Sequence, residues 1–303
     1  MQTRRVDPVL ALAGLGVGLV VGLTGMGGGA LMTPLLVLVF NVPPLAAVSS
    51  DLAASAVMKP FGGWVHYRRG TVNWQLVRWL CVGSVPSAFA GVLLLRVIPG
   101  DEAVQQSIEY ALGAALVLAA VGLVAKASAG RRRSRRGGKE PATIVVRPLA
   151  TALLGAVGGL VVGLTSVGSG SLIIVILLAL YPVLRPNDLV GTDLVQAVPL
   201  VTAAAVGHLL FGDLQFPLAG AILVGSIPGV LIGARLSSRA PGDIVRAALV
   251  VVLLASALRL FGLPGPVVLV TVGLTAASAV AILVTARRRN RTVETALEPV
   301  GHP

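Results

Sequence analysis

The stretch Val20-Val-Gly-Leu-Thr-Gly-Met-Gly-Gly-Gly29 returns as Val161-Val-Gly-Leu-Thr-Ser-Val-Gly-Ser-Gly170, 141 residues later in the chain. Both copies lead from an apolar segment into a cluster of glycines, a composition that interrupts a helix. After one inserted residue the spacing becomes 142, and identities continue at that spacing: Asp51-Leu52 with Asp193-Leu194, and His66 with His208. The chain is therefore an internal duplication.

The duplication divides the chain into two homologous halves. A further match, Val82-Gly-Ser-Val-Pro86 with Val224-Gly-Ser-Ile-Pro228, extends the likeness through most of each half. We place the first transmembrane repeat at about 8–126 and the second at about 148–262. The remaining parts are a basic linker at 127–147, an additional apolar segment at 264–286 and a tail at 287–303.

The composition predicts a membrane protein. Of the 303 residues, 55% are hydrophobic and 12% are charged, and the mean hydropathy is +0.91. Soluble domains have about 25% charged residues. This excludes a secreted or cytosolic enzyme, and also a nucleic-acid-binding domain despite the net charge of +12. We expect a multi-pass protein of the cell membrane.

Each half contains five apolar segments. They lie at about 9–24, 30–42, 44–65, 75–98 and 105–126, and at about 148–164, 171–184, 186–208, 216–236 and 244–262. A helix needs about 20 residues to cross the hydrocarbon core, so the second segment of each half is too short. Short segments beside glycines at matching positions are typical of the broken helices of transporters. We predict an all-α bundle of two inverted-topology repeats plus one C-terminal transmembrane helix.

The orientation follows from the basic residues. If all five segments of each half cross the membrane, the halves are inverted and Met1 lies outside. The linker 127–147 and the cluster 287–291 then both lie inside, as the positive-inside rule requires. Parallel halves with four crossings each would put the cluster 287–291 outside.

The residues of the repeat also resemble a known family. The turns Gly25-Met-Gly-Gly-Gly29 and Ser166-Val-Gly-Ser-Gly170, with the stretch His66-Tyr-Arg-Arg-Gly-Thr-Val-Asn-Trp74, resemble the sulfite exporter TauE/SafE family. Asn73 stands where the family pattern has an acid. The resemblance covers about 8–262 and implies a permease for small anions, often sulfite or organosulfonates.

The two glycine breaks are the candidate anion site. Interrupted helices present backbone N–H groups and a positive dipole end, and hydroxyls add further donors. The alternative is that these small residues serve close helix packing. The candidate substrate-binding residues are Thr24, Gly25, Gly27, Gly28, Gly29, Lys59, Thr165, Ser166, Gly168, Ser169 and Gly170.

Ionisable residues within apolar segments form a second group. Asp51 and Asp193 occupy the same repeat position, whereas Lys59 corresponds to Val201 in the other half. A charge near the bilayer centre is costly unless it is paired, so Lys59 is expected either to pair with an aspartate or to attract the anion. A structural Asp–Lys bridge is the alternative. His66 and His208 are candidates for proton coupling or for interfacial hydrogen bonding.

No cofactor or metal is expected, because the sequence has neither a phosphate-binding loop nor a metal-ligand pattern, and it predicts no enzyme. We expect a secondary transporter working by alternating access, with proton coupling as an option. An anion channel, a carrier of small carboxylates, and a receptor or scaffold are the alternatives. The expected partners are a small anion and the lipid bilayer, with no nucleic acid, and a homo-oligomer is compatible with the sequence.

The orientation yields the first prediction. A cysteine introduced into the linker 127–147 should be protected in intact cells from an impermeant thiol reagent, because the linker is expected in the cytoplasm. Labelling from outside the cell would overturn the orientation.

Overall fold

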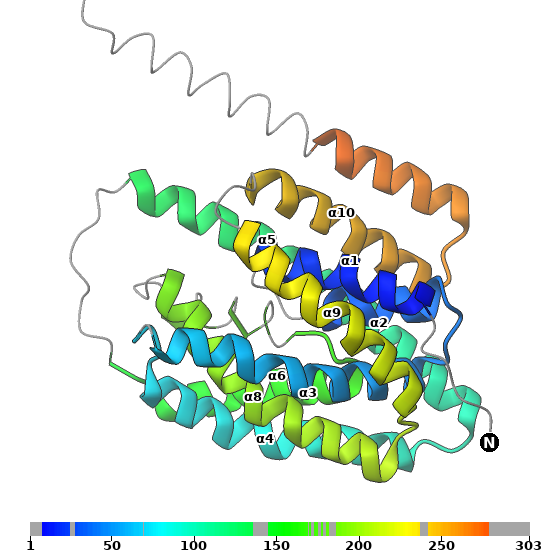
Figure 1. The fold of residues 1–303 in the computed structure, drawn as a ribbon, viewed down its shortest axis with the longest axis horizontal. Coiled ribbons are helices and arrows are strands. Elements are labelled where there is room, and N and C mark those ends of the chain that lie inside the picture. Colours follow the sequence, from blue (N-terminus) through cyan, green and yellow to red (C-terminus); the bar gives the residue numbers. More distant parts are fainter. Residues whose placement is uncertain are drawn as a thin grey trace, which may run out of the picture.

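The computed structural model describes residues 8–24, 28–68, 70–135, 145–168, 170, 173–174, 177, 180–181, 186–236 and 242–278. All regular secondary structure in these residues is α-helical. Figure 1 shows the long helices lying side by side along the long axis of the molecule. The expected all-α class is confirmed for this part of the chain.

The helices follow the duplicated segments. The first half contains α1 (Pro8–Thr24), α2 (Gly29–Leu38), α3 (Pro44–Arg68), α4 (Trp74–Val97) and α5 (Asp101–Arg135). The second half contains α6 (Pro148–Thr165), α8 (Pro186–Phe211), α9 (Phe216–Leu236) and α10 (Gly242–Leu260). A further apolar helix covers Gly265–Ser278, within the expected last segment.

Five helices in the described part of the chain are long and apolar enough to cross a membrane. They are α4, α6, and the portions Asp101–Ala125, Asp188–Phe211 and Phe216–Gly233 of α5, α8 and α9. With 10 residues, α2 reaches only about 15 Å, as expected for a short second segment. Its counterpart at 171–184 lies largely outside the described residues.

One boundary differs from the expectation. The fifth helix does not end near 126 but continues to Arg135, so the linker 127–147 begins as helix. The added residues 127–135 include two alanines and four arginines, which favour helix, and they contain no proline. The end of the apolar segment is therefore not the end of the helix, because residues of high helix propensity extend the helix beyond it.

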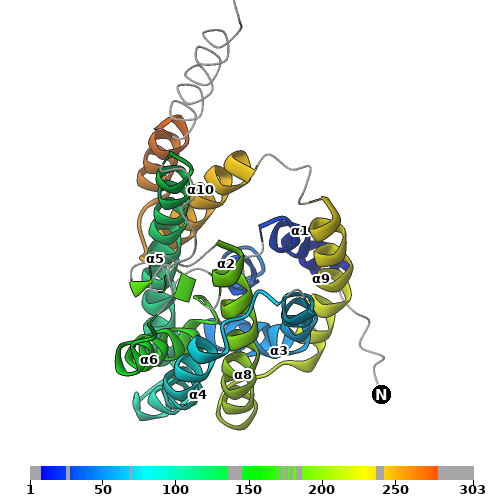
Figure 2. The same ribbon diagram turned by 90° about the vertical axis from the view of Figure 1, so that its left-hand side faces the viewer.

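The halves exchange helices. The first helix of each half packs against the fourth helix of the other half, so that α1 lies against α9 and α6 lies against α4. Figure 2, which looks nearly along the helices, shows these two pairs on either side of a centre formed by α3 and α8. Each half therefore completes its packing on the other.

Glycines bring the exchanged pairs into backbone contact. A Cβ at Gly225 would overlap the carbonyl oxygen of Ala11, and a Cβ at Gly83 would overlap that of Ala152. Because Gly83 and Ala11 are the repeat equivalents of Gly225 and Ala152, the two interfaces are the same contact made twice. Small residues allow this close approach, which stabilises helix pairs in membranes through van der Waals contact.

The equivalent helices α3 and α8 run antiparallel through the centre. Near the start of α3, Ser49 lies beside His208, late in α8. Further along α3, Gly63 packs against Leu194 and Val198, early in α8. Behind this pair, α5 and α10 share an apolar cluster that includes Leu116 and Leu253.

The packing of α9 on α1 yields the second prediction. Gly225→Ala should destabilise the protein by about 1–3 kcal/mol, because the new methyl group overlaps the backbone of α1. Gly220→Ala on the same helix is the matched control, since a Cβ there meets nothing within 4 Å. Thermal unfolding in detergent measures both variants, and equal melting temperatures would contradict the contact.

Candidate functional site

The two glycine breaks meet in the fold. Gly29, the first residue of α2, packs so closely on Ser166 that a Cβ would overlap the serine carbonyl. Ser166 follows the last residue of α6 and has a left-handed backbone, with a φ of 60°. Gly168 has a φ of 120°, a conformation that side chains rarely adopt. The structure thus joins the start of α2 to the end of α6.

Thr165 organises the second break. Its hydroxyl donates to the carbonyl oxygen of Val161 at 2.6 Å, one helical turn earlier. The hydroxyl oxygen of Thr165 also accepts a hydrogen bond from the backbone N–H of Val167 at 3.2 Å. The Thr165 hydroxyl proton is therefore engaged with backbone, and its described bonds shape the break.

Asp51 ties three elements together at the junction of the breaks. Its Oδ2 accepts hydrogen bonds from Thr33 Oγ1 at 2.9 Å and from Ser166 Oγ at 2.6 Å. Thr33 belongs to α2, Asp51 to α3 and Ser166 to the second break, and all three are buried. Ser166 was expected as a substrate donor, but its hydroxyl proton is used by Asp51. Thr33 was missed, since one threonine in an apolar helix gives no pattern.

Lys59 adds a buried positive charge to this region. It is 8% exposed and lies about 12 Å along α3 from Asp51. Asp51 lies on the same helix, and Asp193 lies on α8, which packs against α3. Asp193, from α8, is itself 1% exposed. The structure therefore brings the predicted aspartates and lysine into one charge group.

The two predicted histidines occupy different environments. His208 is fully buried, and its ring nitrogens bond Ser49 Oγ and the carbonyl oxygen of Gly163, each at 2.8 Å. It connects α3, α6 and α8 and is not at an interface with solvent. His66 is half-buried near the end of α3, where its Nδ1 bonds Thr71 Oγ1 at 3.0 Å.

A buried glutamine was missed by the sequence analysis. Gln196 lies one turn after Asp193 on α8, and its Nε2 donates to Ser84 Oγ of α4 at 2.7 Å. Its Oε1 has no hydrogen-bond partner among the described residues. A polar side chain at helical spacing from an intramembrane acid was the available signal.

The remaining predicted residues are partly beyond the described structure. Gly28 and Gly170 are buried within the breaks. A Cβ at Gly28 would make only ordinary contacts, the nearest being Met58 Cε at 3.9 Å. Gly25, Gly27 and Ser169 lie outside the described residues, as does the side chain of Thr24. Within the described ranges, no group of three or more acidic, histidine or cysteine residues could hold a metal ion.

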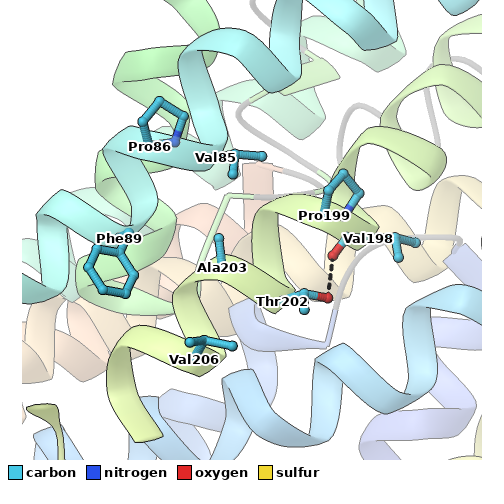
Figure 3. A pocket seen from close by; sticks show the side chains of 8 residues that line it. All are labelled: Val85, Pro86, Phe89, Val198, Pro199, Thr202, Ala203 and Val206. Atoms are coloured by element: carbon cyan, nitrogen blue, oxygen red, sulfur yellow. Dashed lines mark hydrogen bonds between the residues drawn. The ribbon is translucent and has the colours of Figure 1, made fainter. Parts of the chain in front are cut away.

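An apolar cavity between α4 and α8 is distinct from this charged region. Its volume is about 680 Å³, and Figure 3 shows Pro86 and Pro199 on its two walls. The lining residues are Val85, Pro86, Phe89, Val198, Pro199, Thr202, Ala203 and Val206. The one hydroxyl among them, on Thr202, donates to the carbonyl oxygen of Val198. This cavity offers no charge or free donor to an anion.

Comparison with known proteins places the chain among transporters. The sequence profile of the family described as "Sulfite exporter TauE/SafE" matches residues 10–260. The "Probable membrane transporter protein YjnA" of Bacillus subtilis (strain 168) is 40% identical over 217 residues, which cover 71% of this chain and 84% of that protein. The "Probable membrane transporter protein YdhB" of the same organism is 25% identical over 209 residues, covering 68% and 80%. No solved structure gives a significant match.

The family profile spans both duplicated halves, including the two glycine breaks and the charge group. The resemblance inferred from the sequence motifs is therefore confirmed. The chain belongs to the sulfite exporter TauE/SafE family and is a multi-pass membrane transporter.

Proposed function

We propose that this protein is a secondary transporter of a small anion, with sulfite or another sulfur oxyanion or organosulfonate as the substrate class. The observation that carries the proposal is the contact of the two glycine breaks, Gly29 against Ser166, beside the buried charge group. The family description supports a sulfur oxyanion. The names of the relatives state no substrate, so small organic carboxylates are the alternative cargo.

The chemistry of the breaks suits an anion. The first turn of α2 begins at Gly29, and a helix start carries partial positive charge and backbone N–H donors. Gly28 lies beside Met58, the neighbour of Lys59 in the sequence, so the buried ammonium comes from the adjoining stretch of α3. Backbone donors and one cation can replace the hydration shell of an oxyanion and still release it.

The arrangement of the halves supports alternating access. The repeat-equivalent helices α3 and α8 run antiparallel, which favours inverted halves related by an axis in the membrane plane. In such an arrangement the site lies where the halves meet, and rocking one helix group against the other exposes it to each side in turn. The exchanged pairs α1–α9 and α4–α6 would move as units, since their backbones are in contact.

Transport kinetics provide the third prediction. In proteoliposomes, uptake of sulfite or a small sulfonate should saturate with concentration and respond to a proton gradient. Saturation follows because each cycle of a carrier moves a bound substrate. Flux that follows the anion's own gradient at channel rates would favour a pore, and uptake of carboxylates in preference to sulfur oxyanions would reassign the cargo.

Gly28 yields the fourth prediction. Gly28→Ala should abolish anion-induced thermal stabilisation and transport, because the methyl group lies where an anion would approach the start of α2. The fold should tolerate it, since the nearest side-chain atoms would be 3.9 Å and 4.0 Å from the new carbon.

Gly220→Ala, a change of the same size at an open position of α9, is the matched control for Gly28→Ala. Size-exclusion chromatography verifies that both variants stay monodisperse. Normal transport by the Gly28 variant would mean that this break serves packing alone.

A further inference from the structure

The two equivalent aspartates have different hydrogen-bonding surroundings. Asp51 accepts bonds from the hydroxyls of Thr33 and Ser166. By the repeat spacing, the position equivalent to Ser166 is Gly25, and the positions that correspond to Thr33 are Ile174 and Val175. None of these positions carries a hydroxyl, so the repeat gives Asp193 no counterpart of either donor. The duplication supplies Asp51 with two donors that it does not supply to Asp193.

Lys59 and the second aspartate, Asp193, are buried side chains of opposite charge on the adjacent helices α3 and α8. The buried acidic and basic side chains among the described residues are Asp51, Lys59, Asp193 and His208. Asp51 lies about 12 Å from Lys59 along the same helix, whereas Asp193 lies on α8, which packs against α3. The packing of Gly63, one turn after Lys59, against Leu194 and Val195 brings α3 close to the segment of α8 that carries Asp193. An ammonium on α3 and a carboxylate on α8 are thus buried where the two central helices pack together.

Binding of an anion to Lys59 would change this balance. A carboxylate that loses its counter-ion in a buried place is costly, and it neutralises itself by taking up a proton. When the ammonium of Lys59 binds an anion, Asp51 still accepts hydrogen bonds from its two hydroxyl donors. Asp193 does not have those donors, so the cost falls on Asp193.

We propose that Asp193 binds one proton when an anion occupies Lys59, and that Asp51 is a structural acceptor that holds the two breaks together. The inference rests on the proposed function, because it requires an anion at Lys59. The proton is given up by a hydronium ion or a buffer acid of the solution, and it forms the O–H bond of a neutral carboxylic acid. A monovalent anion and one proton then enter together, so their binding adds no net charge.

The charged groups near Asp193 leave Asp193 itself as the group that takes up the proton. The elements packed against α8 are α3, α4 and α6. From α3 come Lys59, Asp51, the exposed Arg68 and the half-buried His66, whose Nδ1 bonds Thr71. α4 carries only the exposed Arg78 and Arg96, and α6 has no charged side chain. On α8 itself, Asp188 lies in the first turn, and His208 has both ring nitrogens bonded.

A stability cycle without ligand tests the pairing, which is the first half of the fifth prediction. Lys59→Met should lower the melting temperature by about 5 °C or more, because it leaves Asp193 without its counter-charge. Adding Asp193→Asn to Lys59→Met should restore most of the loss, whereas adding Asp51→Asn should not. Rescue by Asp51→Asn in place of Asp193→Asn would overturn the pairing. If Lys59→Met alone cannot be purified, recovery of the protein in the Asp193→Asn double variant gives the same answer.

Proton counting tests the coupling. The probes are methanesulfonate, sulfate and thiosulfate, which take up no proton of their own near pH 7. Calorimetric titration in two buffers of different ionisation enthalpy should give about one proton taken up per bound anion in the unchanged protein and in Asp51→Asn. Asp193→Asn should bind without proton uptake. Binding of any probe to the unchanged protein without a proton, or continued uptake in Asp193→Asn, contradicts the inference.

The two experiments distinguish a failure of the proposed function from a failure of the proton step. Absence of binding by all three probes, and by sulfite and small carboxylates, would overturn the proposed function and the proton step with it. The stability cycle would still report whether Lys59 pairs with Asp193. Binding with the wrong proton count would overturn the proton step alone.

Discussion

Backbone contact at glycines determines how the two halves fit together. In a bilayer the surrounding lipid is as apolar as the side chains, so helices gain little from burying hydrophobic surface against each other. The remaining source of stability is close van der Waals contact between helices. Two helix pairs approach until their backbones touch, at Gly225 against Ala11 and at Gly83 against Ala152. Because α6 is held in this way against α4, its end reaches Gly29 and Asp51. The junction of the breaks depends on the glycine interfaces on both sides of it.

Much of this arrangement can be predicted from the sequence, because it depends on local sequence patterns. Apolar length and glycine clusters predicted the helices, the short α2 and the breaks, and repeat identity predicted that Asp51 and Asp193 occupy equivalent positions in the two halves. The partner exchange between α1 and α9 could not be predicted, since a glycine stripe does not say which helix it faces. Thr33 and Gln196 are single polar side chains whose importance depends on a tertiary contact. His208 stands near a helix end, where an interfacial site was reasonable, but α6 covers it through Gly163.

The halves have diverged in charge while keeping their packing. The glycine contacts are preserved in both exchanged pairs, yet Lys59 faces its own half's Asp51 and the other half's Asp193 without a second lysine to match. A symmetric pair of helices can exchange two equivalent conformations at little cost, while an asymmetric charge distinguishes one conformation from the other. The symmetric scaffold thus allows two conformations, and the unmatched residues Lys59 and Ser166 make these two conformations differ.

The exchange of helices also has a consequence for biosynthesis. When the ribosome has completed α4, the helices that will cover its glycine face and that of α1 have not yet been made. α6 and α9 follow only after the basic segment, so the first half must wait in the membrane with Gly83 and Gly18 unpaired. The contact of α9 with α1 therefore joins the earliest helix to one made late in the chain, and α10, which packs on α5, is made later still.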